Sequence, residues 1–375
     1  RMKILHITPS YKPAYIYGGP TESVSRLCEG LAANGHEVDV YTSTANGKTE
    51  LDVVPGKVTV VDGVNVTYFK RVTGDPTNVS FALWAELRKT AKNYDVIHLQ
   101  SWWNILIIVS AYISLSSKAR VIVSPRGMLC EYIFNSGKSI PKKIIHKLIG
   151  RKLLAQCRLH ATVVAEYQEC RELIPGWEGF VLPNILSLPD DEILPNVNDD
   201  FTVVFLSRIH PKKGLEKLFE AISQLDINLK LKIGGSGEEQ YIDKLKNLAA
   251  RLNIASKIEW LGWVGRKEKF SLLQNSDLFV LVSLNENFAN VVIEALHMGT
   301  AVLISEDVGL SKFVEEKKMG WVCTLEVENI AKTLNEAYHD KEKLSFIRNN
   351  GRAIIEREFS PNVLIKQYIE EYQKG

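Results

Sequence analysis

The stretch from Phe201 to Gly214 reads Phe-Thr-Val-Val-Phe-Leu-Ser-Arg-Ile-His-Pro-Lys-Lys-Gly. Its first six residues form a continuous apolar run of the length of a buried strand, and polar and basic residues follow at once. Similar runs recur at 229–233, 258–261, 278–282 and 301–304, with helical patterns between them. Strands that alternate with helices in this way predict a parallel sheet with crossover helices.

The same alternation occupies the first half of the chain. Short β-branched runs lie at 3–7, 37–41, 64–69, 96–99 and 121–124, and a helical pattern from Thr21 to Asn34 separates the first two. Asn34-Gly35 is a typical helix stop, and the next strand starts almost immediately. We therefore predict an α/β protein with two Rossmann-like, doubly wound domains.

The length of 375 residues favours two domains, because single cores rarely grow beyond about 250–300 residues. A segment rich in Pro, Asp and Asn between the two strand series predicts a linker. The expected division is an N-terminal domain over 1–183, a linker over 184–199 and a C-terminal domain over 200–360. A final amphipathic helix over 361–375 can pack back on either domain, and we name the N-terminal one.

Charge, cysteine and terminal patterns limit partners and location. Lys plus Arg is 46 and Asp plus Glu is 44, so the net charge of +2 gives no reason to expect nucleic acid. The five cysteines form no C-x-x-C pair, and the apolar run at 4–7 is too short for a signal peptide. We expect a cytoplasmic protein. The uncharged stretch 99–117 has the length of a membrane span, but its seven polar residues favour a buried helix.

Several motifs of other enzyme classes are incomplete. Gly47-Lys48-Thr49 and Gly137-Lys138-Ser139 lack the upstream glycine of a P-loop, and Gly235-Ser236-Gly237 lacks the third glycine of a dinucleotide fingerprint. The chain has neither H-E-x-x-H nor D-x-D, so we expect no metal and no cofactor.

Three features of the second half point to one ligand class. Arg208 and Lys213 follow a strand, at the sheet edge where ligands of open α/β folds bind, and cations there suit a diphosphate. Glu286 precedes, and Glu294 lies within, a helix predicted to begin near Ala289, whose first free N–H groups favour anions. Carboxylates accept hydrogen bonds from hydroxyls, so a nucleoside-diphosphate sugar fits all these groups. Two plainer interpretations are a solvated basic loop and a Glu294 placed for the helix dipole. Two further glycine loops follow strands of the same domain, Ile233-Gly-Gly-Ser-Gly237 and Leu261-Gly-Trp-Val-Gly265, and let a ligand approach the backbone closely.

These segments together resemble the retaining glycosyltransferases of family four, which have the GT-B fold with two domains facing a central cleft. The matching residues are Ser207-Arg208, Lys212-Lys213-Gly214-Leu215, Gly234-Gly-Ser-Gly237, Leu261-Gly-Trp-Val264, Ser276-Asp-Leu-Phe-Val280, the pair Glu286 and Glu294 with seven residues between, and Ala295-Leu296 before Gly299-Thr300. In the first half Gly18-Gly19, Val24 to Leu31, Gly35-His-Glu-Val38 and Asp95-Val-Ile-His98 are similar more loosely.

The resemblance implies a role for each matched position. Arg208 and Lys213 would neutralise the leaving diphosphate in place of a metal, Glu286 would contact the hexose and Glu294 the ribose. The remaining donor-binding positions are Gly18, Gly19, Gly235, Gly237, Val264, Phe288, Ala289 and Asn290. Members of the family often carry His-Gly where this chain has Arg126-Gly127, so Arg126 is an acceptor-side candidate. His98 is a second, although a histidine satisfied inside a strand end is an equal alternative.

The segment 139–155 predicts where the acceptor lies. It interleaves six basic residues with Ile and Leu and contains no acid, which is typical of a basic amphipathic helix. Such a helix either lies on an anionic membrane near a lipid-linked glycan or packs on the first domain with a solvated basic face. The expected activity is transfer of a hexose from a UDP- or GDP-sugar to a glycan hydroxyl in surface polysaccharide or glycolipid assembly. The alternatives are a nucleotide-sugar epimerase or phosphorylase of GT-B architecture and a non-catalytic bilobal sugar-binding protein.

Overall fold

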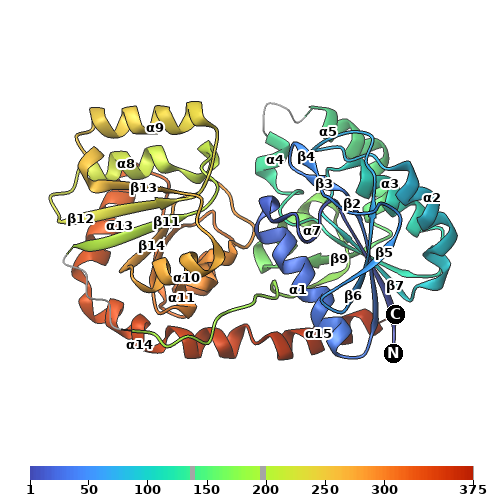
Figure 1. Ribbon diagram of the computed structural model, residues 1–375. Helices are drawn as coiled ribbons and strands as arrows, with labels where there is room; N and C mark the ends of the chain where they lie inside the picture. The colour runs from blue at the N-terminus through green and yellow to red at the C-terminus, as the bar shows by residue number, and fades with distance from the viewer. Residues whose placement is uncertain (136–139, 195–199, 375) are drawn as a thin grey trace. The chain divides into compact units, whose positions relative to one another are not determined.

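The computed structural model describes residues 1–135, 140–194 and 200–374 (Figure 1). The chain forms two compact units, one made of residues 1–187 with 361–375 and the other of residues 188–360. The boundary thus follows Ser187, and the predicted linker divides between the units, with its residues 195–199 outside the described ones. The final helix belongs to the first unit.

The first unit is built on an eight-stranded sheet of order β10-β9-β8-β7-β1-β2-β6-β5, in which only β5 runs antiparallel to its neighbour. The strands are β1 Lys3–Thr8, β2 Glu37–Ser43, β5 Val58–Val61, β6 Val64–Phe69, β7 Val96–Gln100, β8 Arg120–Ser124, β9 Arg158–Ala161 and β10 Gly179–Val181, and a separate small pair is β3 Ala45–Asn46 with β4 Thr49–Glu50. Neither the small pair nor three strands of the large sheet, β5, β9 and β10, were predicted. These three strands lie at the two sides of the sheet, and their short sequences give too few alternations to separate a strand from a loop.

Helices cover both faces of this sheet. They are α1 Gly19–Ala33, α2 Phe81–Thr90, α3 Ile105–Ser114, α4 Glu131–Asn135, α5 Ile140–Ile145, α6 Arg151–Leu154, α7 Val164–Leu173 and α15 Pro361–Gln373, with single 3-10 turns at Tyr15–Tyr17 and Ala91–Asn93. Successive strand residues point to opposite faces, so Ile4 packs in the core beneath α1 and α15 while Leu5 packs in the core beneath α2 and α3. Burial on both sides explains why the central strands β1, β7 and β8 do not alternate, whereas β2 and β6, nearer one side of the sheet, alternate in their first three residues.

The stretch 99–117 forms the end of β7, a loop and the ten-residue helix α3. Leu106, Ile107 and Ala111 of α3 are fully buried, as predicted for a helix packed on the sheet. Within the described residues, no helix is both long enough and apolar enough to cross a bilayer.

The basic segment is helical from Ile140 to Leu154, and Ser139 lies outside the described residues. A π-helical stretch, His146–Gly150, joins α5 to α6 and places His146 and Gly150 inward. The outward side exposes both apolar and basic side chains, namely Ile140, Ile144, Ile145, Leu148 and Ile149 with Lys143, Lys147, Arg151 and Lys152. Apolar and basic side chains are therefore exposed together on the outward side of the helix, and much of its apolar surface has no contact with the other described residues of the first unit.

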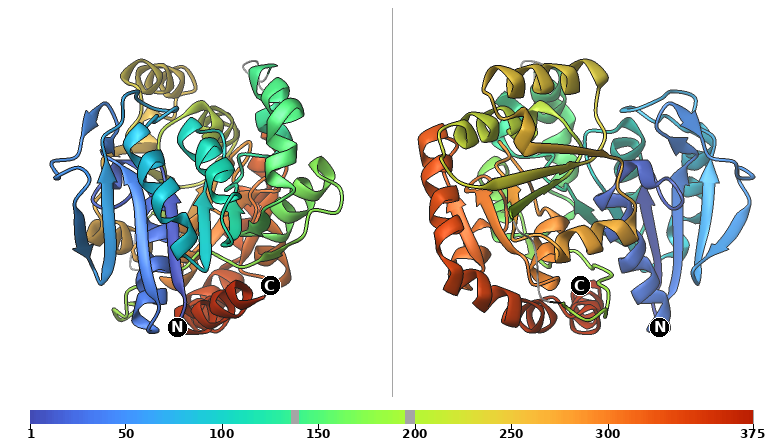
Figure 2. Two further views of the ribbon diagram at one scale, coloured as in Figure 1. Left: turned by 90° about the vertical axis from the view of Figure 1, so that its right-hand side faces the viewer. Right: turned by 60° about the vertical axis from the view of Figure 1, so that its left-hand side comes forward.

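Helix α15 is fixed to the first unit by a buried polar network. Tyr372 O–H lies 2.5 Å from His98 Nδ1, and Tyr368 O–H lies 2.9 Å from His160 Nε2. Ile365 packs against the backbone of Gly30 in α1, where any larger residue would meet its side chain. Figures 1 and 2 show α15, drawn in red, beside this unit with both chain ends at one edge.

The second unit contains a parallel six-stranded sheet of order β13-β12-β11-β14-β15-β16. Its strands are β11 Phe201–Leu206, β12 Leu229–Gly234, β13 Ile258–Gly262, β14 Leu278–Leu281, β15 Ala301–Ser305 and β16 Gly320–Cys323, the last of which was not predicted. Its helices are α8 Leu215–Ser223, α9 Glu239–Arg251, α10 Arg266–Gln274, α11 Asn290–His297, α12 Ser311–Glu316, α13 Val327–His339 and α14 Lys341–Glu358, with 3-10 turns at Pro211–Lys213 and Ala255–Lys257. The two doubly wound sheets confirm the predicted fold class.

Candidate functional site

The basic loop after β11 lies at the carboxyl edge of the second sheet. Arg208 is exposed and forms no ion pair with any described residue, whereas Lys213 closes a 3-10 turn and is largely buried. Gly214 then adopts φ of +72°, and a Cβ there would lie 2.0 Å from the carbonyl oxygen of Val282. Only glycine allows this loop to pack so closely on the neighbouring strand end.

Backbone hydrogen bonds join the glycine loops to the basic loop. Gly235 N donates to Gly262 O at 2.7 Å, and Ile209 N donates to Ser236 O at 2.8 Å. A Cβ on Gly235 would lie 1.9 Å from Ser207 O, and one on Gly237 would lie 2.2 Å from Ile209 O. Val264 packs against Gly234. Three consecutive strand ends thus form one continuous backbone surface, as the glycine pattern predicts.

Glu286 is held in the loop between β14 and α11. Its backbone N–H donates to Asp307 O at 3.0 Å, and its carbonyl accepts from Gly309 N at 2.8 Å. Its carboxylate forms an ion pair with Lys213 and accepts a hydrogen bond from Ser283 Oγ at 3.1 Å. The carboxylate and the ammonium group therefore meet, although 73 positions separate them in sequence.

Helix α11 begins one residue later than predicted. Ala289 is the N-cap and has φ of +65°, a left-handed conformation that costs a non-glycine residue about 1 kcal/mol or more. Phe288 is buried against Phe359, and Asn290 opens the first turn. A helix leaves most of its first backbone N–H groups without internal partners. Because α11 follows β14, the neighbour of β11, its first turn lies at the same carboxyl edge of the sheet as the basic loop.

Glu294 is buried inside this region, with 3% of its surface exposed. Its carboxylate forms an ion pair with Lys269 of α10 at 2.6 Å. Lys269 was not predicted, because nothing in the spacing of α10 indicates that one lysine faces a buried acid on another helix. The role of Ser283 was also not predicted, because the sequence does not show that its hydroxyl donates to the carboxylate of Glu286.

The basic loop carries a positive local potential. Burial lowers the pKa of His210, and the nearby charges of Arg208, Lys212 and Lys213 lower it further. Arg208, Lys212 and Lys213 thus act together on one neighbouring group, and a cluster of cations of this kind favours an anion. This electrostatic preference is local, since the chain as a whole is nearly neutral.

In the first unit, Gly18 and Gly19 lie at the start of α1. Gly18 is the N-cap with φ of +69°, and a Cβ there would meet no atom within 4 Å. Position 18 therefore favours glycine because of its backbone conformation, and not because a side chain there would clash with a neighbour. Pro20 follows in the first helical turn, as is common at helix starts.

His98 is a correction to the predicted acceptor side. It is completely buried, and its two ring nitrogens are hydrogen-bonded to Tyr372 and to Ser124 Oγ, the latter at 2.6 Å. A ring without exposed surface or a free nitrogen cannot contact a substrate. The alternative interpretation, a buried histidine whose ring nitrogens are both hydrogen-bonded within the protein, therefore holds for His98.

Arg126 lies at the carboxyl end of β8 and is half-buried. Its Nε donates to Gln100 Oε1 at 2.9 Å, and its Nη1 donates to Asn184 Oδ1 at 3.0 Å and to Ser23 Oγ at 3.3 Å. Burial lowers the pKa of Arg126. Among the predicted acceptor-side residues it is the accessible one.

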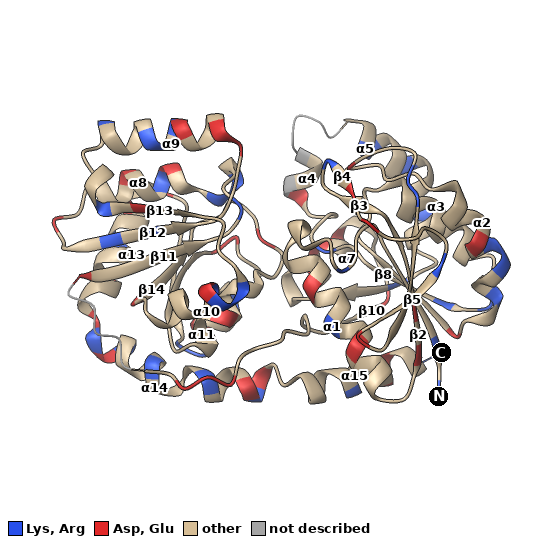
Figure 3. Cartoon of the chain, in the orientation of Figure 1, with Lys and Arg blue, Asp and Glu red and all other residues tan. Residues whose placement is uncertain are grey.

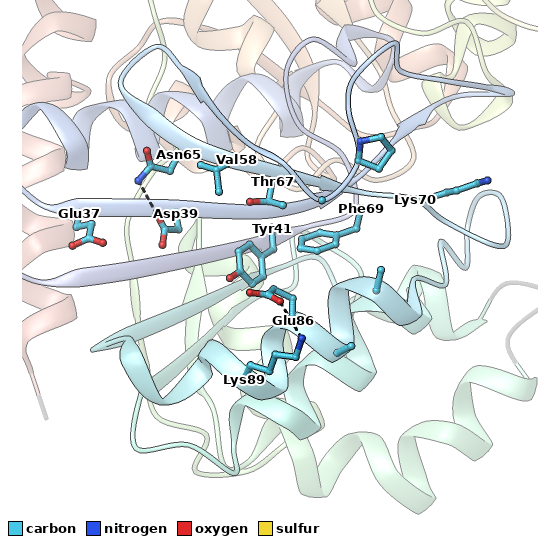
Figure 4. A pocket seen from close by; sticks show the side chains of 14 residues that line it. Glu37, Asp39, Tyr41, Val58, Asn65, Thr67, Phe69, Lys70, Glu86 and Lys89 are labelled. Atoms are coloured by element: carbon cyan, nitrogen blue, oxygen red, sulfur yellow. Dashed lines mark hydrogen bonds and ion pairs between the residues drawn. The ribbon is translucent and has the colours of Figure 1, made fainter.

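The first unit also has a cavity of about 520 Å³ between α2 and the strands β2 and β6 (Figure 4). Its polar floor is self-paired, because Asp39 accepts hydrogen bonds from Asn65 at 2.9 Å and from Tyr94 at 2.6 Å. Glu86 and Lys89 of α2 also pair with each other. No predicted site residue lines this cavity.

Two family models match the chain. The model described as glycosyl transferases group 1 matches residues 189–354, and that of the glycosyl transferase 4-like domain matches residues 18–184. The first contains Arg208, Lys213, Glu286 and Glu294.

Individual proteins are similar over most or all of their length. An uncharacterised glycosyltransferase of Methanocaldococcus jannaschii is 25% identical over 99% of this chain and 98% of its own. A D-inositol 3-phosphate glycosyltransferase of Corynebacterium glutamicum is 23% identical over 84% of this chain and 82% of its own. The crystal structure of the Anabaena protein HepE in complex with UDP-glucose superposes with a TM-score of 0.77, at 22% identity and 99% coverage of both chains. From the two matched domains and this shared fold, we conclude that the chain belongs to the group 1 glycosyltransferases of the family four type, with the GT-B fold.

Proposed function

We propose that this enzyme transfers a hexose from a nucleoside-diphosphate sugar to an acceptor hydroxyl with retention of the anomeric configuration and without a metal ion. The observation that carries the proposal is the arrangement of three groups at one sheet edge: Arg208, which has no ion-pair partner among the described residues, the Lys213–Glu286 ion pair and the start of α11. Cations and backbone N–H groups there suit a diphosphate, and the carboxylate suits sugar hydroxyls.

The proposed mechanism assigns charge stabilisation to the protein. As the bond between the hexose and the diphosphate breaks, negative charge grows on the leaving oxygen, and Arg208 and Lys213 neutralise it in the role that a metal has elsewhere. Glu286 orients the hexose hydroxyls. The departing diphosphate itself accepts the proton of the attacking hydroxyl on the same face, so no protein base is required.

The donor class is a UDP- or GDP-hexose. Support for the uridine nucleotide comes from the Anabaena structure, which holds UDP-glucose in a protein of the same fold. The acceptor is a glycan or lipid-linked glycan in surface polysaccharide or glycolipid assembly.

The helical segment 140–154 supports a site of action on the cytoplasmic face of a membrane. Ile144 and Leu148 are 53% and 66% exposed, and the segment has basic residues but no acid (Figure 3). Apolar groups that enter the interface and cations that attract anionic headgroups are the two contributions that bind such a helix to a bilayer. We therefore propose peripheral association with an anionic membrane through this segment.

Thermal stabilisation tests the donor site. A ligand that binds the folded state raises its melting temperature, so UDP-, GDP- and ADP-sugars are compared with EDTA present. We expect a shift with one base in the native protein, the same shift in the control Arg251→Ala, and its loss in Arg208→Ala. No shift with any nucleotide sugar at millimolar concentration would contradict the proposal.

Product analysis separates transfer from the rival reactions. A glycosyltransferase releases free nucleoside diphosphate in step with glycosylated acceptor, whereas an epimerase changes the sugar without releasing the nucleotide. A phosphorylase requires inorganic phosphate. A non-catalytic sugar-binding protein would leave the nucleotide sugar unchanged.

A further inference from the structure

Arg126 occupies a strained backbone position that directs its side chain. The turn Pro125-Arg126-Gly127-Met128 is closed by Met128 N donating to Pro125 O at 3.1 Å. Arg126 and Gly127 have φ of +53° and +77°, the signature of a type I′ turn, in which a non-glycine residue is unfavourable at the first central position. Asn, Asp or Gly would fit this backbone with less strain. The backbone of this turn does not favour arginine, so we infer that the guanidinium group of Arg126 has a function.

Neutral groups hold the guanidinium in place. Its three hydrogen-bond acceptors, Gln100, Ser23 and Asn184, come from three separate parts of the first unit and carry no charge. Gln100 is itself fixed by a hydrogen bond with His6 at 3.2 Å. These contacts use Nε and Nη1, and no described residue accepts a hydrogen bond from Nη2.

Glu166 is the acid whose charge affects the pKa of Arg126, and its carboxylate already accepts hydrogen bonds from other groups. Glu166 is buried and accepts hydrogen bonds from Gly127 N at 2.7 Å and from Thr162 N at 2.9 Å. No carboxylate of the described residues forms an ion pair with Arg126, although other arginines of this unit, such as Arg71, have such partners. An oriented, half-buried cation with no ion-pair partner among the described residues is prepared for an anion that arrives with a ligand.

We propose that Arg126 binds an anionic group, phosphate or carboxylate, carried by the acceptor. This inference rests on the proposed transfer reaction and deepens it. The donor diphosphate already has Arg208 and Lys213 in the other unit, so a further oriented cation at the sheet edge of the first unit serves a second anion. The acceptor thus combines a nucleophilic hydroxyl with a negatively charged group, and Arg126 determines that specificity.

Inorganic phosphate is the probe, measured on the full chain by phosphorus NMR at constant ionic strength. Phosphate can also bind at the donor site, so the titrations use the Arg208→Gln background. We expect the dissociation constant to rise about tenfold or more when Arg126→Gln is added, since charge-assisted hydrogen bonds are lost. Arg126→Lys, which keeps the charge without the planar fork, should give an intermediate value.

Arg120→Gln is the matched control, because it removes an arginine from the opposite end of the same strand. It should leave phosphate binding unchanged. If Arg126→Gln has no larger effect than Arg120→Gln, the proposal is wrong. If Arg126→Gln does not fold, Arg126→Lys is compared with Arg120→Gln in its place.

A second arm identifies the source of the anion in the native protein saturated with the nucleoside diphosphate that binds it. Phosphate that still binds through Arg126 belongs to an acceptor subsite. Displacement of that phosphate by the nucleotide would assign Arg126 to the donor and overturn the proposal. Nucleotide binding is measured separately, so a failure of the donor site and a failure of the Arg126 site are distinguished.

Discussion

Lys213 and Glu286 form an ion pair at the carboxyl edge of the second sheet. The lysine ends a 3-10 turn after β11, while the glutamate is fixed by two backbone hydrogen bonds to the loop after β15. In the proposed reaction the ammonium group serves the diphosphate and the carboxylate serves the hexose. Their pairing places the two functions next to each other, as the bond that joins hexose to phosphate requires.

Glu286→Ala should lower the transfer rate about 100-fold or more, a loss typical for a group that stabilises the transition state. Affinity for nucleoside diphosphate should remain nearly unchanged, because Lys213 is still present. Steady-state kinetics and calorimetry measure the two quantities. Glu306→Ala removes a nearby exposed carboxylate and is the control. A wild-type rate in Glu286→Ala would remove this residue from the site.

Tyr372→Phe should destabilise the first unit by about 1–3 kcal/mol, because it leaves a buried nitrogen of His98 without its hydrogen bond. Urea unfolding measures the free energy. Tyr112→Phe, at an exposed position of α3, should change it by less than about 0.5 kcal/mol. Equal effects of both substitutions would show that the network with α15 contributes little.

Stability should fall as the pH drops from about 6.5 toward 3. Burial and, to a smaller extent, the charge of Arg126 lower the pKa of both His6 and His160 to about 3. The unfolded chain, with histidine pKa near 6.5, therefore binds more protons in this range, at about 1.4 kcal/mol per pH unit for each histidine. Above pH 6.5 both histidines are neutral in the folded and the unfolded chain, so their protonation no longer reduces the free energy of unfolding.

The variant His160→Gln tests this relation. Between pH 6 and pH 5 the free energy of unfolding should decline less steeply than in the native protein, and the difference in slope should be about that of one bound proton, about 1.4 kcal/mol per pH unit. Urea titrations at both pH values supply the slopes. An unchanged slope would mean that His160 is protonated in the folded state.

Neutralising Lys142, Lys143 and Lys147 should weaken binding to vesicles that contain anionic lipid, and added salt should weaken binding of the native protein. Co-sedimentation measures the bound fraction. A triple variant of Lys230, Lys244 and Lys332 changes the net charge equally at exposed positions of the second unit. Ile144→Ser with Leu148→Ser should weaken binding even at low salt. Binding that survives all these changes would favour a purely structural helix.

Some of the fold could be predicted because its signals are local. Each central strand, such as Phe201–Leu206, is an uninterrupted apolar run, and Asn34-Gly35 ends α1 by backbone chemistry alone. The peripheral strands β5, β9, β10 and β16 could not be predicted, since they have three or four residues each and depend on pairing with a neighbour.

The sequence alone determined the doubly wound units, the glycines of the strand-end loops and the residues of the basic loop, because periodicity and turn chemistry act over a few positions. Only the tertiary structure decided which charges meet. It paired Lys269 with Glu294 and Lys213 with Glu286, buried His98 against a tyrosine 274 positions away, and left Arg126 among neutral partners. Such contacts depend on how distant segments pack, and spacing within a single segment carries no information about them.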